Sequence, residues 1–429
     1  MEIIRTYPLR GGPVIYFIPF GKTQIPLPLP DHRSPHWVTY NTHPADLAFD
    51  YISHSLQNPI AAKPLHEAVR GYRKAVILIS DASRLCPSYL FLEQLLDAIN
   101  QGGIADACIT IVIALGLHRK QTEQEIKELV GTSVFRRVQV LNHSSLPEDC
   151  IQLGVTQMGT PVEINKHVVE ADFRMVTGNL EPHALAGVSG GVKALFPGAA
   201  SSAAIEHNHS LSQAYPATPG DPNNAVRADM EEMLGFVPIH YLLNVVVDHE
   251  RNLLGAVAGD VIEAHRAAMD LVRRTFCVTV PYMFDVVIVS PGGYPKDTQL
   301  YQAVKSLTNA ASITKPGGTI ILIAQCEEQY GNGILQYWVD TIQDRRVMVQ
   351  KLKEKFTMGA HKIEHIDKVL NKHTVYLHSL MSPKSIELLG FQPVPDLKAT
   401  LAMLLKDPAT SVAVLPYGGI TFPQVKVSS

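Results

Sequence analysis

The sequence contains few cysteines, and none of them is placed for a shared metal or disulfide framework. The 429 residues include five cysteines, which are odd in number, widely spaced and free of any CxxC pair. This pattern argues against a disulfide scaffold and against a structural zinc site. A reducing cytoplasm is the compartment that fits it best.

An excess of charge of one sign and long apolar runs are also lacking. Lys and Arg number 37 against 40 Asp and Glu, a net charge of -3, so nucleic acid is not an expected partner. No stretch approaches the roughly 20 apolar residues of a membrane span. The first residues, MEIIRTYPLRGGPVIYFIPFG, are interrupted by Pro and Gly. We therefore expect no signal peptide and no membrane segment.

What the sequence does contain is a series of short apolar runs, each followed by Gly or polar residues and then by a helical period. A composition of 46% hydrophobic and 18% charged residues predicts a compact chain of two to three domains. Runs that are apolar on both faces are typical of parallel strands covered by helices, so we expect α/β domains with doubly wound sheets. The runs cover residues 75–80, 109–115, 173–177, 284–290 and 319–324, with further strands expected at 245–247 and 412–415.

A domain boundary is expected near residues 271–281, where an Arg-bearing helical stretch gives way to a new strand. We therefore expect an N-terminal cofactor-binding α/β domain over 1–275 and a C-terminal α/β domain over 276–429. In this prediction the last strand, at about 410–429, can pack either within the second domain or back on the first. The segment YPATPGDPNN, residues 215–224, has turn chemistry and no apolar period, so it predicts a long loop.

Reactive side chains follow four of the expected strands. Ligands of open α/β sheets bind beyond the carboxyl ends of the strands, so these positions are the first candidates for a site. Each residue also has an ordinary structural alternative: a hydrogen-bonded histidine, a turn ion pair or a solvated lysine. The candidates are Asp81 and Arg84 in DASRLCP, His118 in GLHRKQTEQE, His183 and Lys193 in EPHALAGVSGGVKALFPG, and Tyr301, Gln302 and Lys305 in YPKDTQLYQAVKSL.

Two short motifs leave their chemistry open. The run AGVSGGVK is typical of anion binding through backbone N–H groups, but it matches neither the P-loop nor the GxGxxG pattern, and a tight turn is the alternative. His207 and His209 could face one metal ion from a strand but not from one helix face. Nickel, copper, iron and zinc all accept imidazole, and two surface histidines at a helix start are the alternative.

These motifs together resemble the nickel-dependent lactate racemase family. The strings DASR, GLHRKQTEQE, PHALAGVSGGVKALFPG and YPKDTQLYQAVK occur in the family's order and spacing, from Asp81 to Lys305. The length of the chain also fits the family's two-domain members. The resemblance implies two doubly wound α/β domains with the active site in the cleft between them.

The resemblance also implies a cofactor. Family members carry a nickel-pincer nucleotide, a pyridinium-3-thioamide-5-thiocarboxylic acid mononucleotide, attached covalently to the lysine of an SGGxK motif. That lysine is Lys193 here, in a cofactor-binding loop with Ser189, Gly190 and Gly191. The nickel ligand, sixteen residues beyond the lysine, falls on His209 and leaves His207 without an assigned role. Tyr301 is expected beside the cofactor or substrate.

The implied reaction is racemisation or epimerisation of a 2-hydroxy acid by reversible hydride transfer. The carbon-bound hydrogen is not acidic, so hydride loss coupled to deprotonation of the hydroxyl is easier than proton abstraction. His118 and His183 are the expected acid and base. The resemblance assigns the substrate carboxylate to Arg84, Gln302 and Lys305, with Asp81 orienting the arginine.

One departure from the family concerns specificity. Lactate-specific members usually continue the arginine with Pro-Thr-Pro, whereas this chain has Leu85-Cys86-Pro87. Loss of a proline at position 85 changes the backbone beside Arg84, so we expect a substrate other than lactate.

Two other functions are considered, together with the expected partners. The first is a zinc hydrolase that uses His207 and His209, although a third ligand is missing from the sequence pattern. The second is a non-catalytic nucleotide-binding protein of the same fold. Under the racemase interpretation the partners are a small 2-hydroxy acid and the enzymes that mature the cofactor, and a homodimer is left open.

Overall fold

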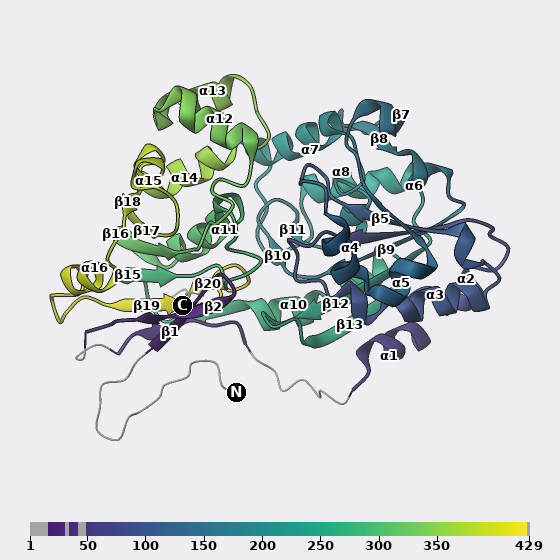
Figure 1. Cartoon of the computed structure of the whole chain (residues 1–429), viewed down its shortest axis with the longest axis horizontal. Helices are drawn as coiled ribbons and strands as arrows, with labels where there is room; N and C mark the ends of the chain where they lie inside the picture. Colours follow the sequence, from purple (N-terminus) through teal and green to yellow (C-terminus); the bar gives the residue numbers. More distant parts are fainter. Residues whose placement is uncertain (1–15, 31–33, 42–48, 427–429) are drawn as a thin grey trace. The chain divides into compact units, whose positions relative to one another are not determined.

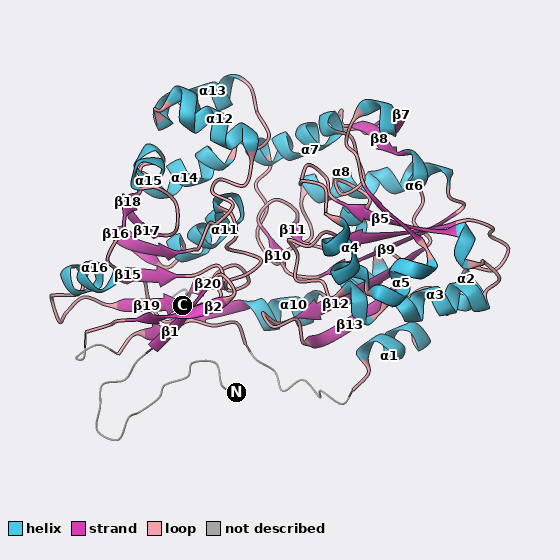
Figure 2. Ribbon diagram, in the orientation of Figure 1, coloured by secondary structure: helices cyan, strands magenta, loops and turns pink. Residues whose placement is uncertain are grey.

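The computed structural model describes residues 16–30, 34–41 and 49–426, which form two compact units. Unit 2 spans Thr42–Thr275, and unit 1 joins the residues up to Asn41 to Phe276–Ser429. In each unit helices flank the strands (Figure 2). The absence of a signal peptide was predicted from a segment that includes residues 1–15, which lie outside the described residues.

Unit 2 is built on a six-stranded sheet in the order β13-β12-β9-β4-β5-β6 (Figure 1). The pairs are parallel except β12 with β13, which is antiparallel. Two antiparallel hairpins, β7-β8 and β10-β11, stand apart from this sheet. The strands are β4 (Ala75–Ser80), β5 (Ile109–Ala114), β6 (Gln139–Asn142), β7 (Cys150–Val155), β8 (Pro161–Asn165), β9 (Phe173–Asn179), β10 (Pro182–His183), β11 (Gly187–Val188), β12 (Tyr241–Val247) and β13 (Leu253–Gly259).

The helices of unit 2 begin at side-chain caps in several places. Thr122 and Glu125 form a capping box at the start of α4, and Ser201 and Asn224 cap α7 and α8. Residues 215–224 are a loop, as expected. The helices are α1 (Tyr51–Gln57), α2 (Leu65–Ala68), α3 (Leu92–Gln101), α4 (Glu123–Val130), α5 (Thr132–Arg137), α6 (Lys166–Glu170), α7 (Ser202–Ala214), α8 (Ala225–Glu232), α9 (Glu263–Ala267) and α10 (Met269–Phe276), with short 3-10 helices at Ser88–Leu90, Asp106–Cys108, Pro147–Asp149, Gly191–Ala194 and Met233–Gly235.

Unit 1 contains a second six-stranded sheet, ordered β18-β17-β16-β15-β19-β3, in which every pair is parallel. Two-stranded pairs, β1-β2 and β14-β20, complete it. The strands are β1 (Tyr16–Phe20), β2 (Thr23–Leu27), β3 (His36–Trp37), β14 (Cys277–Val280), β15 (Phe284–Val289), β16 (Thr314–Ile323), β17 (Thr374–His378), β18 (Gln392–Pro393), β19 (Val412–Leu415) and β20 (Phe422–Val425), and the helices are α11 (Leu300–Ala311), α12 (Gly333–Ile342), α13 (Arg345–Glu354), α14 (Lys362–Leu370), α15 (Pro383–Leu388) and α16 (Leu397–Leu404).

The sheet of unit 1 is buried on both faces, which explains its apolar strands. Val287 and Val289 of β15 pack into a core with α11 and α14, whereas Val286 and Ile288 pack into a second core with α16 and the β1-β2 hairpin. Alternate side chains of a strand point to opposite faces, so one apolar run supplies both cores. The α/β class with doubly wound sheets in two units is therefore confirmed.

The N-terminal residues belong with the C-terminal part of the chain, which differs from the expected first domain over 1–275. Ile18 and Leu27 are 0% and 1% exposed and cover one face of the unit 1 sheet, and β3 extends that sheet beside β19. The last strand, β20, pairs with β14 inside the same unit. Burial of the apolar hairpin gives the physical reason, since the boundary near residue 275 shows in the sequence but this packing does not.

Within the described residues, none of the helices combines the length and the hydropathy needed to cross a membrane.

Candidate functional site

Both sheets reverse their winding direction at a point beside candidate site residues. In unit 2 the chain winds outward from β4 through β5 to β6 and then restarts at β9 on the other side of β4. Ligands of such sheets bind outside the carboxyl ends of the strands at this switch point. The segments that follow β4, β5 and β9 carry five of the candidates. These are Asp81 and Arg84, His118, and His183 with Lys193.

Asp81 holds together the segments after β4 and β5. Its side chain is 3% exposed, and its Oδ2 lies 3.1 Å from His118 Nδ1 and 3.8 Å from Arg84 Nε. Burial alone would raise the pKa of Asp81, but the charges of His118 and Arg84 outweigh this effect and hold that pKa well below its usual range. An ionised carboxylate only accepts hydrogen bonds, so His118 Nδ1 donates to Asp81, and in the neutral form of the ring the lone pair is on Nε2.

His183 has the opposite tautomer. It lies in the short β10-β11 hairpin, where its Nδ1 accepts hydrogen bonds from the backbone N–H groups of Leu185 (3.1 Å) and Ala186 (3.2 Å). A neutral imidazole whose Nδ1 accepts carries its proton on Nε2. One candidate histidine thus presents a proton acceptor at Nε2 and the other a proton donor.

The Gly-rich loop before Lys193 uses much of its polar backbone internally. The N–H of Gly191 donates to Asn244 Oδ1 at 2.8 Å, and the hydroxyl of Ser189 donates to the carbonyl of Asn179 at 2.7 Å. Gly190 has φ 69°, and a Cβ there would lie 2.5 Å from the Leu180 side chain, so this turn requires glycine. The tight turn and the anion cradle were alternatives in the sequence, and these contacts are those of a tight turn.

Lys193, at the end of this loop, has an unusual electrostatic environment. Burial is the main cause that lowers its pKa well below the ordinary value, and the positive charges of Arg84 and Arg227 lower it further. The amine therefore loses its proton at a lower pH than an ordinary lysine does. A neutral amine is a nucleophile, whereas an ammonium is not.

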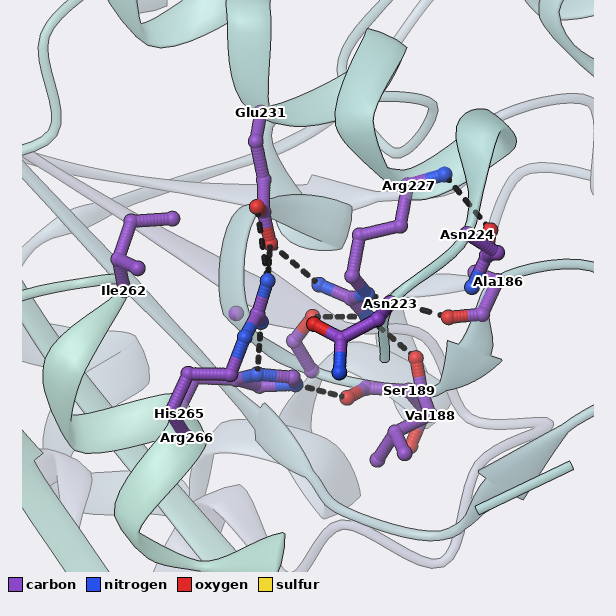
Figure 3. Close-up of polar contacts among 12 residues, drawn as sticks. Ala186, Val188, Ser189, Asn223, Asn224, Arg227, Glu231, Ile262, His265 and Arg266 are labelled. Atoms are coloured by element: carbon purple, nitrogen blue, oxygen red, sulfur yellow. Dashed lines mark hydrogen bonds and ion pairs between the residues drawn. The ribbon is translucent and has the colours of Figure 1, made fainter. Parts of the chain in front are cut away.

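A network of charged side chains forms hydrogen bonds to the same loop (Figure 3). Arg227 of α8 is 1% exposed; its guanidinium donates to the carbonyls of Ala186 at 3.1 Å, Val188, and Gly190 at 3.5 Å. Burial lowers the pKa of Arg227 only to about 10, so it remains charged. The loop is thus fixed by three of its own carbonyl groups.

The remaining contacts of this network connect Glu231 to the backbone of Ser189. Glu231 accepts from Arg227 Nη1 at 3.4 Å and from Arg266 Nη2 at 2.9 Å. Arg266 donates to His265 Nδ1, and the buried His265 donates from Nε2 to the Ser189 carbonyl, both at 2.9 Å. Burial lowers the pKa of His265 well below its usual value, which keeps it neutral in this role.

His207 and His209 lie on α7, a helix, and do not converge. Successive residues of a helix are about 100° apart, so the two imidazoles point to nearly opposite sides. His207 Nε2 bonds to the Met158 carbonyl at 3.0 Å, while His209 Nδ1 bonds to the Ile205 carbonyl at 2.9 Å. Because Nδ1 of His209 donates, the lone pair of that ring is on Nε2, the form that ligates metals.

The residue between these histidines anchors α7. Asn208 is 0% exposed and donates to Asp229 Oδ2 of α8 at 2.7 Å. The same carboxylate accepts from the hydroxyls of Thr156 at 2.5 Å and Thr160 at 2.7 Å. Helix α8 therefore holds both the loop of Lys193, through Arg227, and the helix of His209, through Asp229.

No group of three His, Cys, Asp or Glu side chains is placed to hold a metal ion within residues 16–30, 34–41 and 49–426. A catalytic zinc site takes three protein ligands. The zinc-hydrolase alternative therefore has no ligand set in this part of the chain.

The remaining candidates belong to unit 1, at the switch point of its own sheet. The order of that sheet reverses between β15 and β19, and α11 follows β15. Tyr301, Gln302 and Lys305 lie in the first turns of α11, as the expected helix requires. That they act together with the residues of unit 2 stays a prediction.

Comparison with known proteins identifies the family. Residues 20–218 match the model of the lactate racemase N-terminal domain, and residues 280–421 match that of the lactate racemase C-terminal domain. This chain belongs to the lactate racemase family. A lactate racemase of Thermoanaerobacterium thermosaccharolyticum is 33% identical over 78% of this chain and 80% of that protein, and one of Lactiplantibacillus plantarum is 30% identical over 86% and 89%.

Solved structures agree with the lactate racemase family fold. The lactate racemase apoprotein of T. thermosaccharolyticum superposes with a TM-score of 0.86 at 30% identity, covering 96% of this chain and 100% of that one. A protein of Thermotoga maritima, at 17% identity, has a TM-score of 0.67 over 85% of this chain and 98% of its own, which shows a shared fold.

The departure from the lactate racemase family pattern beside Arg84 lies inside the protein. Leu85 and Cys86 are 4% and 2% exposed, and burial raises the pKa of the Cys86 thiol to about 12. The two side chains that follow Arg84 in the sequence are therefore part of the protein interior.

Sequence reasoning missed the residues that position this site. Arg227, Asp229 and His265 are distant in sequence from the loops that they hold, and the main partners of Arg227 are backbone carbonyls, which leave no mark in a sequence. One signal was available. Arg227 and Asp229 belong to a short helix, AVRADMEE, directly after the Pro-rich loop. Treating that helix as amphipathic would have indicated that these two charged residues could be buried.

We predict that Arg227→Met loosens the loop before Lys193. The change removes the side-chain donor to the buried Val188 carbonyl, a second donor to the Ala186 and Gly190 carbonyls, and one of the two cationic partners of Glu231, so the free energy of unfolding should fall by about 1–3 kcal/mol. Hydrogen exchange of amides 186–193, followed by mass spectrometry, should accelerate. The control is Arg273→Met, whose side chain is 51% exposed and pairs with the exposed Asp270. Unchanged exchange in Arg227→Met would contradict the role.

We predict that Lys193 of the apoprotein reacts with acetic anhydride at lower pH than ordinary lysines. Its pKa is lowered, so the neutral amine should already be present at pH values where exposed lysines are protonated. Because the charge of Arg84 contributes to this shift, Arg84→Met should move the reaction midpoint to higher pH, whereas Arg119→Met should not. Peptide mass spectrometry measures the midpoint, and one in the ordinary lysine range would refute the assignment.

Proposed function

We propose that this protein is a racemase or epimerase of a 2-hydroxy acid, an isomerase whose acid and base are His118 and His183. Membership of the lactate racemase family supports the reaction class. The observation that carries the proposal is the pair of opposite tautomers, since removal of a proton from a hydroxyl group and its return require one accepting and one donating nitrogen.

We propose further that the chain holds a nickel-pincer nucleotide. The residues fit such a group: Lys193 offers an amine whose lowered pKa favours the neutral, nucleophilic form for covalent attachment, and His209 offers a lone pair at Nε2 for nickel. The turn at Ser189, Gly190 and Gly191 leads directly into Lys193, and its glycines let the backbone pack closely against Leu180 and His265. When bound, this nucleotide supplies reversible acceptance of hydride from the substrate carbon.

The chain's own residues would manage protons and orientation. His118 Nε2 takes the hydroxyl proton, and the imidazolium that results is stabilised by the ionised Asp81 at its Nδ1. From the other side, protonated His183 would give a proton from Nε2 to the oxygen of the planar keto acid as the substrate carbon regains hydride, and His183 would be left as a neutral imidazole. Reversal of these two roles accounts for reaction in both directions.

The substrate carboxylate would be bound by Arg84, Gln302 and Lys305. Arg84 lies against Asp81, so the carboxylate that orients His118 also orients the guanidinium. Tyr301, one helical turn before Lys305, would lie beside the substrate or nucleotide. The proposal also gives the protein a cytoplasmic location and the cofactor-maturation enzymes as partners. It does not specify whether the protein is a homodimer.

Replacing His118 or His183 with Ala should abolish racemisation of both enantiomers while the nucleotide remains attached. General acid–base groups contribute about 10²- to 10⁴-fold each, so either variant should lose at least 100-fold in kcat. Chiral chromatography measures turnover and intact mass measures loading. His54→Ala, in α1, is the control, and near-normal turnover in either site variant would rule out the role.

The decisive experiment is intact-mass and metal analysis of protein produced together with the cofactor-maturation enzymes. We expect one adduct, on the peptide that contains Lys193, one nickel ion per chain, and racemisation of a 2-hydroxy acid. Fully active enzyme with unmodified Lys193 would refute the attachment. A loaded protein that racemises none of a panel of 2-hydroxy acids would favour the non-catalytic alternative.

A further inference from the structure

Asp297 is a buried residue that joins three segments of unit 1. It lies between β15 and α11 and is 0% exposed. Its Oδ2 accepts hydrogen bonds from the backbone N–H of Gly21 at 2.7 Å and from that of Gln325 at 3.2 Å. Gly21 lies in the turn between β1 and β2, and Gln325 follows β16. One oxygen atom thus connects the N-terminal hairpin with the segments that follow β15 and β16.

The environment of Asp297 favours its use as a hydrogen-bond acceptor. Burial, together with the negative charge of Glu327, raises the pKa of Asp297 above its ordinary value, although the two N–H groups oppose this shift. Among the described residues, none donates a hydrogen bond to its second oxygen, Oδ1. The contacts of the side chain are therefore those of Oδ2, and burial disfavours the negative charge.

The turn of the β1-β2 hairpin packs closely against the loop that follows β15. The N–H of Tyr294 donates to the carbonyl of Gly21, and the hydroxyl of Ser290 donates to the carbonyl of Pro19, both at 2.8 Å. Gly21 has φ 58°, and a Cβ there would lie 2.2 Å from Oε1 of Gln325. The turn therefore requires glycine at this position, and the hairpin holds the loop that leads to α11.

Helix α11 begins on the segments that Asp297 connects. Its first N–H groups, those of Leu300 and Tyr301, donate to the carbonyls of Gln329 and Tyr330 at 2.9 and 3.2 Å. These carbonyls belong to the segment after β16, which Asp297 binds through its side chain and through its own carbonyl. The first turn of α11 is thus held in place by hydrogen bonds that lead back to Asp297.

We propose that Asp297 is a positioning residue for substrate binding, which acts through α11. The inference rests on the proposed racemase function, in which Gln302 and Lys305 of this helix bind the substrate carboxylate. Both residues lie in the first turns of α11, close to the end that Asp297 holds. Charge-assisted hydrogen bonds depend on distance and direction, so a shift of this end would weaken the grip on the carboxylate. The proposal gives the N-terminal hairpin a function in substrate binding.

Steady-state kinetics of the cofactor-loaded Asp297→Ala enzyme tests the proposal. The substrate is the 2-hydroxy acid that the wild-type enzyme racemises fastest. We expect KM to rise about 10- to 100-fold, the effect of one weakened charge-assisted hydrogen bond. Because carboxylate binding serves the ground state and the transition state alike, kcat should change less than about threefold. An unchanged KM, or a loss confined to kcat, would overturn the proposal.

Two further variants separate positioning from general stability. Asp297→Asn keeps an accepting oxygen, so its KM should stay within about threefold of the wild-type value, and a loss equal to that of Asp297→Ala would refute the acceptor role. The matched control is Asp285→Ala, at the other end of β15. Asp285 accepts from the N–H of Ser411 at 2.9 Å and from Nζ of Lys315 at 2.8 Å. Its loss destabilises the same unit, and a KM raised as in Asp297→Ala would refute positioning.

Hydrogen exchange of the apoprotein measures the contact without turnover. In Asp297→Ala, amides 300–303 should exchange about 10-fold faster or more, whereas Asp297→Asn and Asp285→Ala should exchange as the wild type does. If Asp297→Ala does not fold, Gly21→Ala displaces the same contact from the hairpin and should give the same rise in KM and in exchange. Wild-type values in folded Gly21→Ala would then refute the proposal.

The two measurements also distinguish this inference from the racemase proposal. Faster exchange with an unchanged KM would refute the role of Asp297 in substrate binding and leave the racemase function in place. If the loaded wild-type enzyme racemises no 2-hydroxy acid, the racemase proposal fails, and with it the role in substrate binding. Faster exchange in Asp297→Ala would then still show that Asp297 holds the start of α11.

Discussion

Parallel strands impose the constraint on which the rest of this structure depends. All strands of a parallel sheet end at one edge, and a chain that winds first one way and then the other leaves a crevice in the middle of that edge. In unit 2 the winding reverses between β4 and β9, and in unit 1 between β15 and β19. Residues far apart in sequence meet there because the winding reverses, without any motif that links them.

The positive charge of Arg84 affects two ionisable groups of unit 2. Arg84 helps to keep Asp81 ionised, and it also disfavours protonation of Lys193. The two effects have the same origin, the positive charge of one guanidinium beside buried groups, but they act on groups of opposite charge. A change at this one position therefore alters the carboxylate behind His118 and the amine of the Gly-rich loop together.

The sequence allowed the prediction of the strands and of the loop at 215–224, because apolar runs and turn residues act locally. It also allowed Arg84 to be expected beside Asp81. It did not predict that the β1-β2 hairpin covers a sheet formed by residues 284–415, since an amphipathic hairpin can cover many surfaces. The motif at His207 and His209 was ambiguous for a different reason, because its meaning depends on whether the backbone is helix or strand. The network of Arg227 was out of reach, since carbonyl groups are the same at every residue.

Helix α8 is one element that forms hydrogen bonds to two others, the loop before Lys193 and helix α7. Arg227 and Asp229 are two residues apart, and they grip the loop of Lys193 and the helix of His209 respectively. Thermal displacement of α8 would therefore carry both elements in the same direction and leave their separation nearly constant. A group bound at both the loop and the helix would therefore be translated and not stretched. Its bond lengths would change little when the surrounding protein fluctuates.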